Sequence, residues 1–427
     1  PNLVIKIKII FNFNMTIQNS LEINIDRLWN DIYETAKIGK GKTNGLSRLT
    51  LSQSDKDVRS EFISLCLKEN LKIRVDEFGN IFAKREGQDN SKKTVLVGSH
   101  LDTHVAGGKF DGVLGVLSGL EIIRTLNQRN IQTLRPIEIV SWTNEEGARY
   151  PPPMMGSGAF VGIHDKEWVY NQTDSEKLKF IDELKKIGFQ GSDNISKDEF
   201  DSYFELHIEQ GSVLEDAGKF VGIVSKGYSA EGRRVSFTGE TSHSGTTPMN
   251  KRKNALVGAA MFINFVENIA NDYENLRAAI TKVDVWPNTF GIVPDFAEVV
   301  IDVRHENSDI SLEVINKIDQ YLKVIEKEKK LITKIEQKWA FNCDKFSKRL
   351  IQLVSNKCEE LKVGYTHMFS QAAHDAYHLT NICDSVLIFC PCKDGLSHNE
   401  NEHVDSEVAK PSINVLLNSI VDRANQI

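Results

Sequence analysis

An imidazole and two carboxylates lie close together in one short stretch of this 427-residue chain. His100 and Asp102 follow the β-branched run 94–97, and Asp111 follows the pair Gly107-Gly108. Neutral imidazole and carboxylate oxygen are ligands that zinc and similar divalent metals accept. Glycine allows the backbone to approach a bound ion closely. The pattern therefore predicts a divalent-metal site.

The elements expected around these residues form a βαβ unit. The sequence predicts a strand over 94–99, a helix near 113–128 and a second strand over 137–142. This order is typical of a parallel sheet, in which ligands bind beyond the carboxyl ends of the strands. The polar residues after the first strand and Asn144-Glu145-Glu146 after the second should therefore converge on one edge.

Chain length and patterning predict an α/β protein of two domains, because a single core rarely exceeds about 250–300 residues. The larger domain, residues 15–227 and 342–427, is expected to hold a mixed, largely parallel sheet flanked by helices. Residues 228–341 are expected to form an inserted, smaller α+β lid or dimerisation domain. Further helices are expected over 24–38, 57–69, 254–271, 311–328 and 346–361, and strands over 234–237, 279–286, 297–304 and 385–389.

Composition excludes several classes of function. The net charge of −7 argues against a nucleic-acid surface, which needs a basic footprint. No apolar run approaches the ~18 residues of a membrane span. Six scattered cysteines without a disulfide framework predict a reduced, cytoplasmic protein. Residues 1–14 are expected to be a non-native or disordered extension that precedes a natural start at Met15.

An ordered series of motifs carries a resemblance to a known family. After the stretch from Gly98 to Gly112 come Thr143-Asn144-Glu145-Glu146-Gly147, Glu205-Leu206-His207-Ile208-Glu209-Gln210-Gly211, Ser242-His243-Ser244-Gly245, Ala373-His374-Asp375-Ala376 and Ser397-His398-Asn399-Glu400-Asn401-Glu402. The series closely resembles the N-carbamoyl-amino-acid hydrolases, the yeast-type β-alanine synthases (β-ureidopropionases) and the allantoate amidohydrolases. These form one branch of the binuclear-zinc aminoacylase and carboxypeptidase clan. The resemblance runs from about Gly39 to Asp405.

The resemblance implies two divalent ions per chain, with zinc expected and manganese, cobalt or nickel as alternatives. It implies metal ligands at His100, Asp111, Glu146, His207 and His398, with Asp111 bridging the ions. Asp102 would orient the second ring nitrogen of His100 through its carboxylate. Glu145 would be the general base that takes a proton from the attacking water.

The resemblance also implies substrate contacts and a homodimer. Substrate-binding groups are expected at Gln210, His243, Asn288, Arg304 and His374. Arg304 would hold a carboxylate bidentately, and His243 would stabilise the oxyanion in a neighbouring subunit's site. The chain departs from the family at Gly291, where relatives usually carry Asn, and at Gln371 and Ala373, where they carry Gly.

The implied reaction is hydrolysis of the ureido group of an N-carbamoyl-L-amino acid or N-carbamoyl-β-alanine to the amino acid, ammonia and carbon dioxide. One alternative is an allantoate amidohydrolase with the same site. A second is a catalytically dead homologue that binds an amino-acid-like ligand, although retention of every implied metal ligand argues against it. Five histidines without a partner pattern are expected to be bystanders: His104, His164, His305, His367 and His403.

One further motif is excluded as a phosphate-binding site. The segment from Gly39 to Thr43 resembles the tail of a phosphate-binding loop, but Ala36 stands where that loop needs glycine. A helix is also expected before it, where the phosphate loop needs a strand.

Overall fold

The structure is a computed structural model that describes residues 20–343 and 345–426. The expected extension, residues 1–14, and Met15 lie outside the described residues. The described chain divides into two compact units. The larger unit comprises the residues up to Ser225, residues 345–368 and those from His374 onward, and the smaller comprises 226–343 and Phe369–Ala373.

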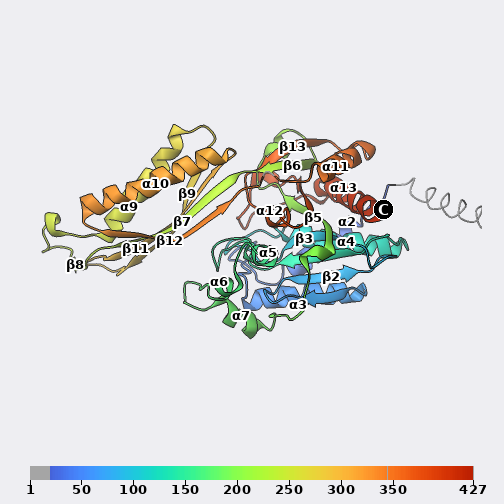
Figure 1. Cartoon of the computed structure of the whole chain (residues 1–427), viewed down its shortest axis with the longest axis horizontal. Helices are drawn as coiled ribbons and strands as arrows, with labels where there is room; N and C mark the ends of the chain where they lie inside the picture. Colours follow the sequence, from blue (N-terminus) through green and yellow to red (C-terminus); the bar gives the residue numbers. More distant parts are fainter. Residues whose placement is uncertain (1–19, 344, 427) are drawn as a thin grey trace, which may run out of the picture. The chain divides into compact units, whose positions relative to one another are not determined.

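The larger unit is built on an eight-stranded mixed sheet (Figure 1). Its strands, in their order across the sheet, are β1 (Lys72–Val75), β2 (Ile81–Arg85), β4 (Ile137–Trp142), β3 (Thr94–His100), β5 (Phe200–Ile208), β14 (Asp384–Cys390), β6 (Val221–Gly227) and β13 (Tyr365–Ser370). The four central strands β4, β3, β5 and β14 pair in parallel. The pairs β1–β2, β2–β4 and β14–β6 are antiparallel.

Helices supply the rest of the larger unit. They are α2 (Ile25–Thr35), α3 (Gln53–Lys68), α4 (Val113–Gln128), α5 (Met155–Val161), α6 (Lys166–Tyr170), α7 (Phe180–Ile187), α8 (Val213–Asp216), α11 (Lys348–Glu360), α12 (Asp375–Leu379) and α13 (Ser406–Asn425). Apolar side chains of α2, α3, α4, α11 and α13 pack with those of the central strands in the main core. Every residue of β3 is buried, as expected for a parallel strand covered on both faces.

The smaller unit is an antiparallel sheet with two helices on it (Figure 1). Its strands lie in the order β12 (Ile332–Phe341), β7 (Ser229–Thr238), β11 (Phe296–His305) and β9 (Arg277–Trp286). The helices α9 (Ala255–Ile269) and α10 (Ser308–Lys329) pack on this sheet and on each other. The short strands β8 (Ser242–His243) and β10 (Ile292–Val293) form a separate pair.

The fold class expected from the sequence is confirmed, with a mixed and largely parallel central sheet. The expected strands over 94–99 and 137–142 and the helix near 113–128 are present as β3, β4 and α4. The patterning did not predict β5, although its run of aromatic and branched residues between Phe200 and Ile208 is a strand signal.

The remaining composition-based expectations concern cysteines and membranes. All six cysteines lie within the described residues, and they form no disulfide there. Among the described residues, every helix is too short or too polar to cross a bilayer.

Arg59, which forms a buried ion pair within α3, connects this helix to the residue after β4. Arg59 and Asp55 are buried, and Arg59 Nε donates to Asp55 Oδ2 at 2.8 Å. The other guanidinium nitrogens of Arg59 donate to the carbonyl of Gly79 at 2.7 Å and to Oγ1 of Thr143 at 3.2 Å. This arrangement holds the segment that leads into Glu145-Glu146.

We predict that Asp55→Ala lowers the free energy of unfolding by about 3–5 kcal/mol, because it leaves the Arg59 charge buried without its counter-ion. Denaturant unfolding measures the change. The control is Glu34→Ala, which removes the exposed partner of Lys37 and should change the free energy by no more than about 0.5 kcal/mol. Equal effects of the two substitutions would contradict this role for the buried pair.

Candidate metal centre

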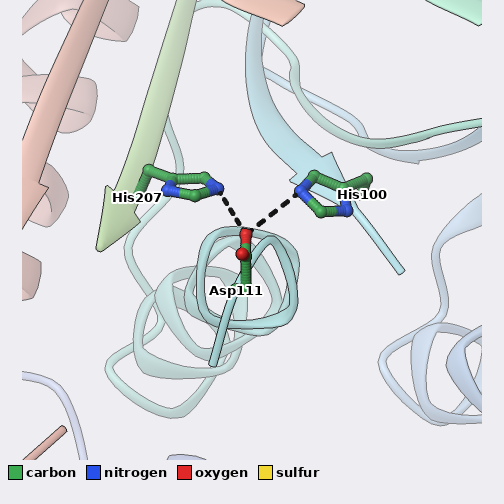
Figure 2. Close-up of side chains that lie close together, drawn as sticks. All are labelled: His100, Asp111 and His207. Atoms are coloured by element: carbon green, nitrogen blue, oxygen red, sulfur yellow. Dashed lines mark ion pairs between the residues drawn. The ribbon is translucent and has the colours of Figure 1, made fainter. Parts of the chain in front are cut away.

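Three buried side chains from three elements meet at one edge of the sheet (Figure 2). His100 is the last residue of β3, His207 lies near the end of the neighbouring parallel strand β5, and Asp111 precedes α4. The Nε2 atoms of His207 and His100 lie 3.0 and 3.6 Å from Oδ1 of Asp111. Parallel strands end at the same edge, so the fold brings the two imidazoles together.

Gly112 makes the close approach of Asp111 possible. Its φ of +68° lies in the left-handed region that favours glycine, and a Cβ there would lie 2.4 Å from the ring of His100. The chain turns at this glycine into α4, which is buried almost throughout. The start of a core helix therefore fixes the Asp111 carboxylate between the two strands.

Main-chain carbonyls fix the orientation of both imidazoles. Nδ1 of His100 lies 2.9 Å from the carbonyl oxygen of Asp102, and Nδ1 of His207 lies 2.9 Å from that of Ile208. A carbonyl only accepts hydrogen bonds, so each Nδ1 carries the proton. Each Nε2 then needs a cation, either a second proton or a metal ion, between itself and Asp111. Neither Nε2 makes a well-formed hydrogen bond within the described chain, so this donor set fits a metal ion.

The Asp102 carboxylate lies farther from the His100 ring than the Asp102 carbonyl oxygen does. Its Oδ1 lies 3.9 Å from Nδ1 of His100, whereas the Asp102 carbonyl oxygen lies at 2.9 Å. The carboxylate instead accepts the backbone N–H groups of Glu145 and Glu146, at 3.2 and 3.3 Å. The turn after β4 thus directs two backbone amides at the Asp102 carboxylate. This residue therefore orients His100 through its main chain and holds the Glu145-Glu146 turn through its side chain.

A second group of possible ligands lies beside the first. It comprises His104, Glu146 and His398, whose ligand atoms lie within 4.8 Å of one another. Oε2 of Glu146 lies 3.3 Å from Nε2 of His398 and 3.2 Å from Nε2 of His104. Oδ2 of Asp111 lies 3.4 Å from Nε2 of His398. One carboxylate thus faces the first group with Oδ1 and the second with Oδ2, as a bridging ligand would.

Glu145 lies at the first group without belonging to it. Its Oε2 is 3.4 Å from Nε2 of His100, and the residue is buried. Burial raises the pKa of its carboxyl well above the usual range. The nearby His100 acts to lower this pKa, and the Asp375 carboxylate acts to raise it. The side chain is therefore placed beside the cluster and is suited to exchange a proton.

The electrostatics of the edge favour cations. Burial raises the pKa of Asp102 to about 7. Burial acts in the same direction on Asp111, but the imidazoles of His100, His207 and His398 hold the pKa of Asp111 well below its usual range. Several carboxyl groups thus share a small buried volume with imidazoles, and divalent cations would relieve their mutual repulsion.

Two expected substrate contacts lie at the same edge. Nε2 of Gln210 donates to Oδ2 of Asp111 at 2.9 Å and to Oγ of Ser397 at 3.1 Å. The ring of His374 is buried, with its centroid 4.3 Å from that of His207. The larger unit therefore brings together every expected metal ligand, Glu145, Gln210 and His374.

The other three expected contacts belong to the smaller unit. Asn288 is exposed in the loop after β9, and His243 is exposed in β8. Nδ1 of His243 accepts the N–H groups of Gly245 and Thr246, at 3.0 and 3.3 Å. The proton of its neutral ring is therefore on Nε2, which can donate outward.

Arg304, also in the smaller unit, has defined partners there. Its Nε donates to Oδ2 of Asp302 at 2.6 Å and its Nη1 to the carbonyl of Gln371 at 2.9 Å. Gln371 is one of the positions at which the chain departs from the family. At another, Gly291, φ is +89°, a conformation that glycine adopts freely and asparagine tolerates better than most residues.

Two anchoring carboxylates were missed from the sequence. Oε1 of Glu402 accepts the N–H groups of Phe110 and Asp111, at 3.0 and 3.1 Å. Glu400 accepts the N–H groups of Lys42 and Thr43. The amides of the excluded phosphate-loop segment are therefore occupied by an internal carboxylate. The motif Ser397–Glu402 contains both residues, but spacing alone does not indicate which backbone amides they reach.

Comparisons with known proteins identify the family of the chain. Residues 96–422 match peptidase family M20/M25/M40. An N-carbamoyl-L-amino-acid amidohydrolase of Rhizobium meliloti is 38% identical, over 94% of this chain and 97% of that protein. An allantoate amidohydrolase of Escherichia coli (strain K12) is 29% identical, over 87% and 91%. A ureidoglycolate hydrolase of Arabidopsis thaliana is 28% identical, over 94% and 87%.

A solved structure extends the likeness to the whole fold. The crystal structure of an amidase of the hydantoinase/carbamoylase family from Burkholderia vietnamiensis matches with a TM-score of 0.92 and 32% identity, covering 96% of this chain and 100% of that one. The chain therefore belongs to peptidase family M20/M25/M40 and is an amidohydrolase, which confirms the resemblance carried by its motifs.

Proposed function

We propose that this amidohydrolase cleaves the ureido group of an N-carbamoyl amino acid, giving the amino acid, ammonia and carbon dioxide. The observation that carries the proposal is one buried carboxylate, Asp111, that faces two groups of possible metal ligands while Glu145 lies beside one of them. The relatives named for N-carbamoyl amino acids, allantoate and ureidoglycolate support a carbamoyl-type C–N bond as the target.

In this proposal His100, His207 and Asp111 hold one divalent ion, and Glu146, His398 and Asp111 hold the other. Imidazole and carboxylate donors favour zinc, and manganese, cobalt or nickel would also fit. Bound there, two such ions would lower the pKa of a water molecule and polarise the scissile carbonyl.

Glu145 serves as the general base. Its carboxylate oxygen is within 3.4 Å of Nε2 of His100, so it would reach a water held at the same edge. After taking the proton, Glu145 would pass it to the leaving nitrogen. Asp102 keeps this turn in place through the two N–H groups that it accepts.

Four further residues would bind the substrate in this proposal. His374 and Gln210 line the metal edge, and Arg304 and Asn288 would bind the amino-acid part. The guanidinium of Arg304 suits a carboxylate because it can donate two parallel hydrogen bonds. His243 would donate from Nε2 to the oxyanion, and its Nδ1 contacts support this tautomer.

We further propose a homodimer in which His243 completes the partner's site. The surface of the smaller unit supports a partner. The residues Met249, Trp286 and Phe290 are 77%, 69% and 102% exposed, and β9 is an edge strand. Exposed apolar groups beside an open strand edge are typical of an interaction surface.

The reaction is tested by ammonia release from N-carbamoyl-L-amino acids, N-carbamoyl-β-alanine, allantoate and ureidoglycolate. We predict turnover of an N-carbamoyl amino acid, its loss on removal of metal with a chelator, and its return on adding zinc. Preference for allantoate would replace the proposed substrate by the alternative one. Binding without hydrolysis of any compound, or turnover that persists without metal, would contradict the proposal.

We predict that Glu145→Gln lowers turnover by about 10²–10⁴-fold while both ions and the fold are retained, because the amide cannot accept a proton at neutral pH. Steady-state assay and metal analysis measure the two quantities. Glu86→Gln, which alters an exposed carboxylate paired with Lys72, is the matched control and should leave turnover unchanged. Near-normal turnover of Glu145→Gln would assign the base to another residue.

The shared site is tested by mixing two inactive chains. His243→Ala should retain metal and lose most activity. Mixed with Glu145→Gln, it should recover about a quarter of the unaltered activity, because half of the randomly formed dimers contain one site with both native groups. If subunit exchange is confirmed and no activity returns, His243 does not act in the partner's site.

A further inference from the structure

His104 has surroundings that its sequence context did not indicate. The residue was expected to be a bystander, yet its Nε2 lies 3.2 Å from Oε2 of Glu146. Its ring centroid is 4.2 Å from that of His398. Both imidazoles thus approach the same oxygen of one carboxylate, since Nε2 of His398 is 3.3 Å from Oε2 of Glu146.

The backbone around His104 is held on both sides. The N–H of Thr103 donates to the carbonyl of Arg48 at 2.9 Å, and the N–H of Arg48 donates to Oγ1 of Thr103 at 2.9 Å. After it, Gly107 and Leu46 exchange two backbone hydrogen bonds of 2.9 Å each. The main chain that carries the imidazole is therefore anchored on both sides.

The same stretch of backbone also anchors the segment of His398. The carboxylate of Glu400, two residues further on, accepts N–H groups of Lys42, Thr43 and Gly45. Hydrogen bonding to the charged form, from the Thr43 hydroxyl first and then from these amides, lowers the pKa of Glu400 to about 2. Both imidazoles are thus carried by segments hydrogen-bonded to residues 42–48.

The spacing of these atoms suits one ion. Two ligands about 2.1 Å from a tetrahedral ion lie about 3.4 Å apart, and the Nε2 atoms of His104 and His398 lie 3.2 and 3.3 Å from Oε2 of Glu146. A simple ion pair would need only one imidazole at that oxygen. Two imidazoles and a carboxylate form a common zinc donor set.

We propose that His104 is itself a metal ligand, binding the second ion together with Glu146 and His398. With Oδ2 of Asp111, 3.4 Å from Nε2 of His398, the second position then has four protein donors. The first position has three, from His100, His207 and Asp111. A four-donor site is closed in the manner of structural zinc sites, while a three-donor site leaves room for water or substrate. The inference rests on the proposed metal centre.

The competing role for His104 is that of a hydrogen-bond donor that positions Glu146. Two substitutions separate the roles. His104→Ala removes both a ligand and a donor, whereas His104→Gln keeps an N–H donor and removes the imidazole. His367→Ala removes an exposed imidazole on β13 and is the matched control.

The experiment measures zinc affinity by competition with a chromophoric chelator and records the visible absorption of the cobalt-loaded proteins. We expect two ions in the unaltered chain and in His367→Ala. In both His104 variants one ion should bind at least about 100-fold more weakly. Loss of a residue that only hydrogen-bonds to a metal ligand lowers metal affinity by about 10–100-fold, so a larger loss indicates a ligand. The cobalt bands should change, because a donor atom is lost.

A smaller loss of affinity in His104→Ala, or recovery of affinity in His104→Gln, would overturn the assignment and leave His104 as a positioning residue. These outcomes leave the two-ion centre intact. An unaltered chain that binds no second ion would overturn both the assignment and the proposed centre. Because the measurement uses no substrate, it separates either failure from a wrong choice of substrate.

Discussion

The structure depends on the crowding of buried carboxyl groups at one edge of the central sheet. Asp102, Asp111 and Glu145 are buried there, and the side chain of Glu146 is only 4% exposed. Charged carboxylates this close repel one another and lose the solvation of water, so the folded chain must supply compensation. Imidazoles from β3, β5 and the segment before α13 supply part of it, and divalent cations would supply the rest. Asp111 connects the two groups of possible ligands, because one of its oxygens faces an imidazole of the first group and the other faces an imidazole of the second.

Three carboxylates at this edge, those of Asp102, Glu400 and Glu402, accept hydrogen bonds from backbone amides. Asp102 accepts two N–H groups of the turn after β4, and Glu402 accepts two at Asp111. Glu400 does the same for the segment that precedes α13, by accepting hydrogen bonds from amides far away in the sequence. Each of these contacts fixes a loop at the carboxyl ends of the strands without adding a charge that would compete with a metal ion. The site is therefore preorganised by the main chain.

Much of this arrangement could be predicted from the sequence. The strand over 94–99 is indicated by its β-branched residues and the helix after Asp111 by its apolar pattern. The expected ligands converge because parallel strands end at one edge. The strand that carries His207 was missed, because it lacks polar–apolar alternation and, unlike residues 94–97, has few β-branched residues and contains Asp201 and Glu205. The carbonyl contact of Asp102 and the position of His104 depend on the path of a turn, which residue types do not specify. Contacts such as that of Glu400 with Thr43 join residues far apart in the chain, and local sequence patterns do not predict them.

The most direct test of a two-ion centre is anomalous diffraction at the zinc absorption edge from crystals of the zinc-loaded protein. The expected result is two peaks about 3.5–4 Å apart. One should lie at His100, His207 and Oδ1 of Asp111, and the other at Glu146 and Oδ2 of Asp111. A single peak at this edge of the sheet, or zinc bound only elsewhere on the chain, would contradict the account.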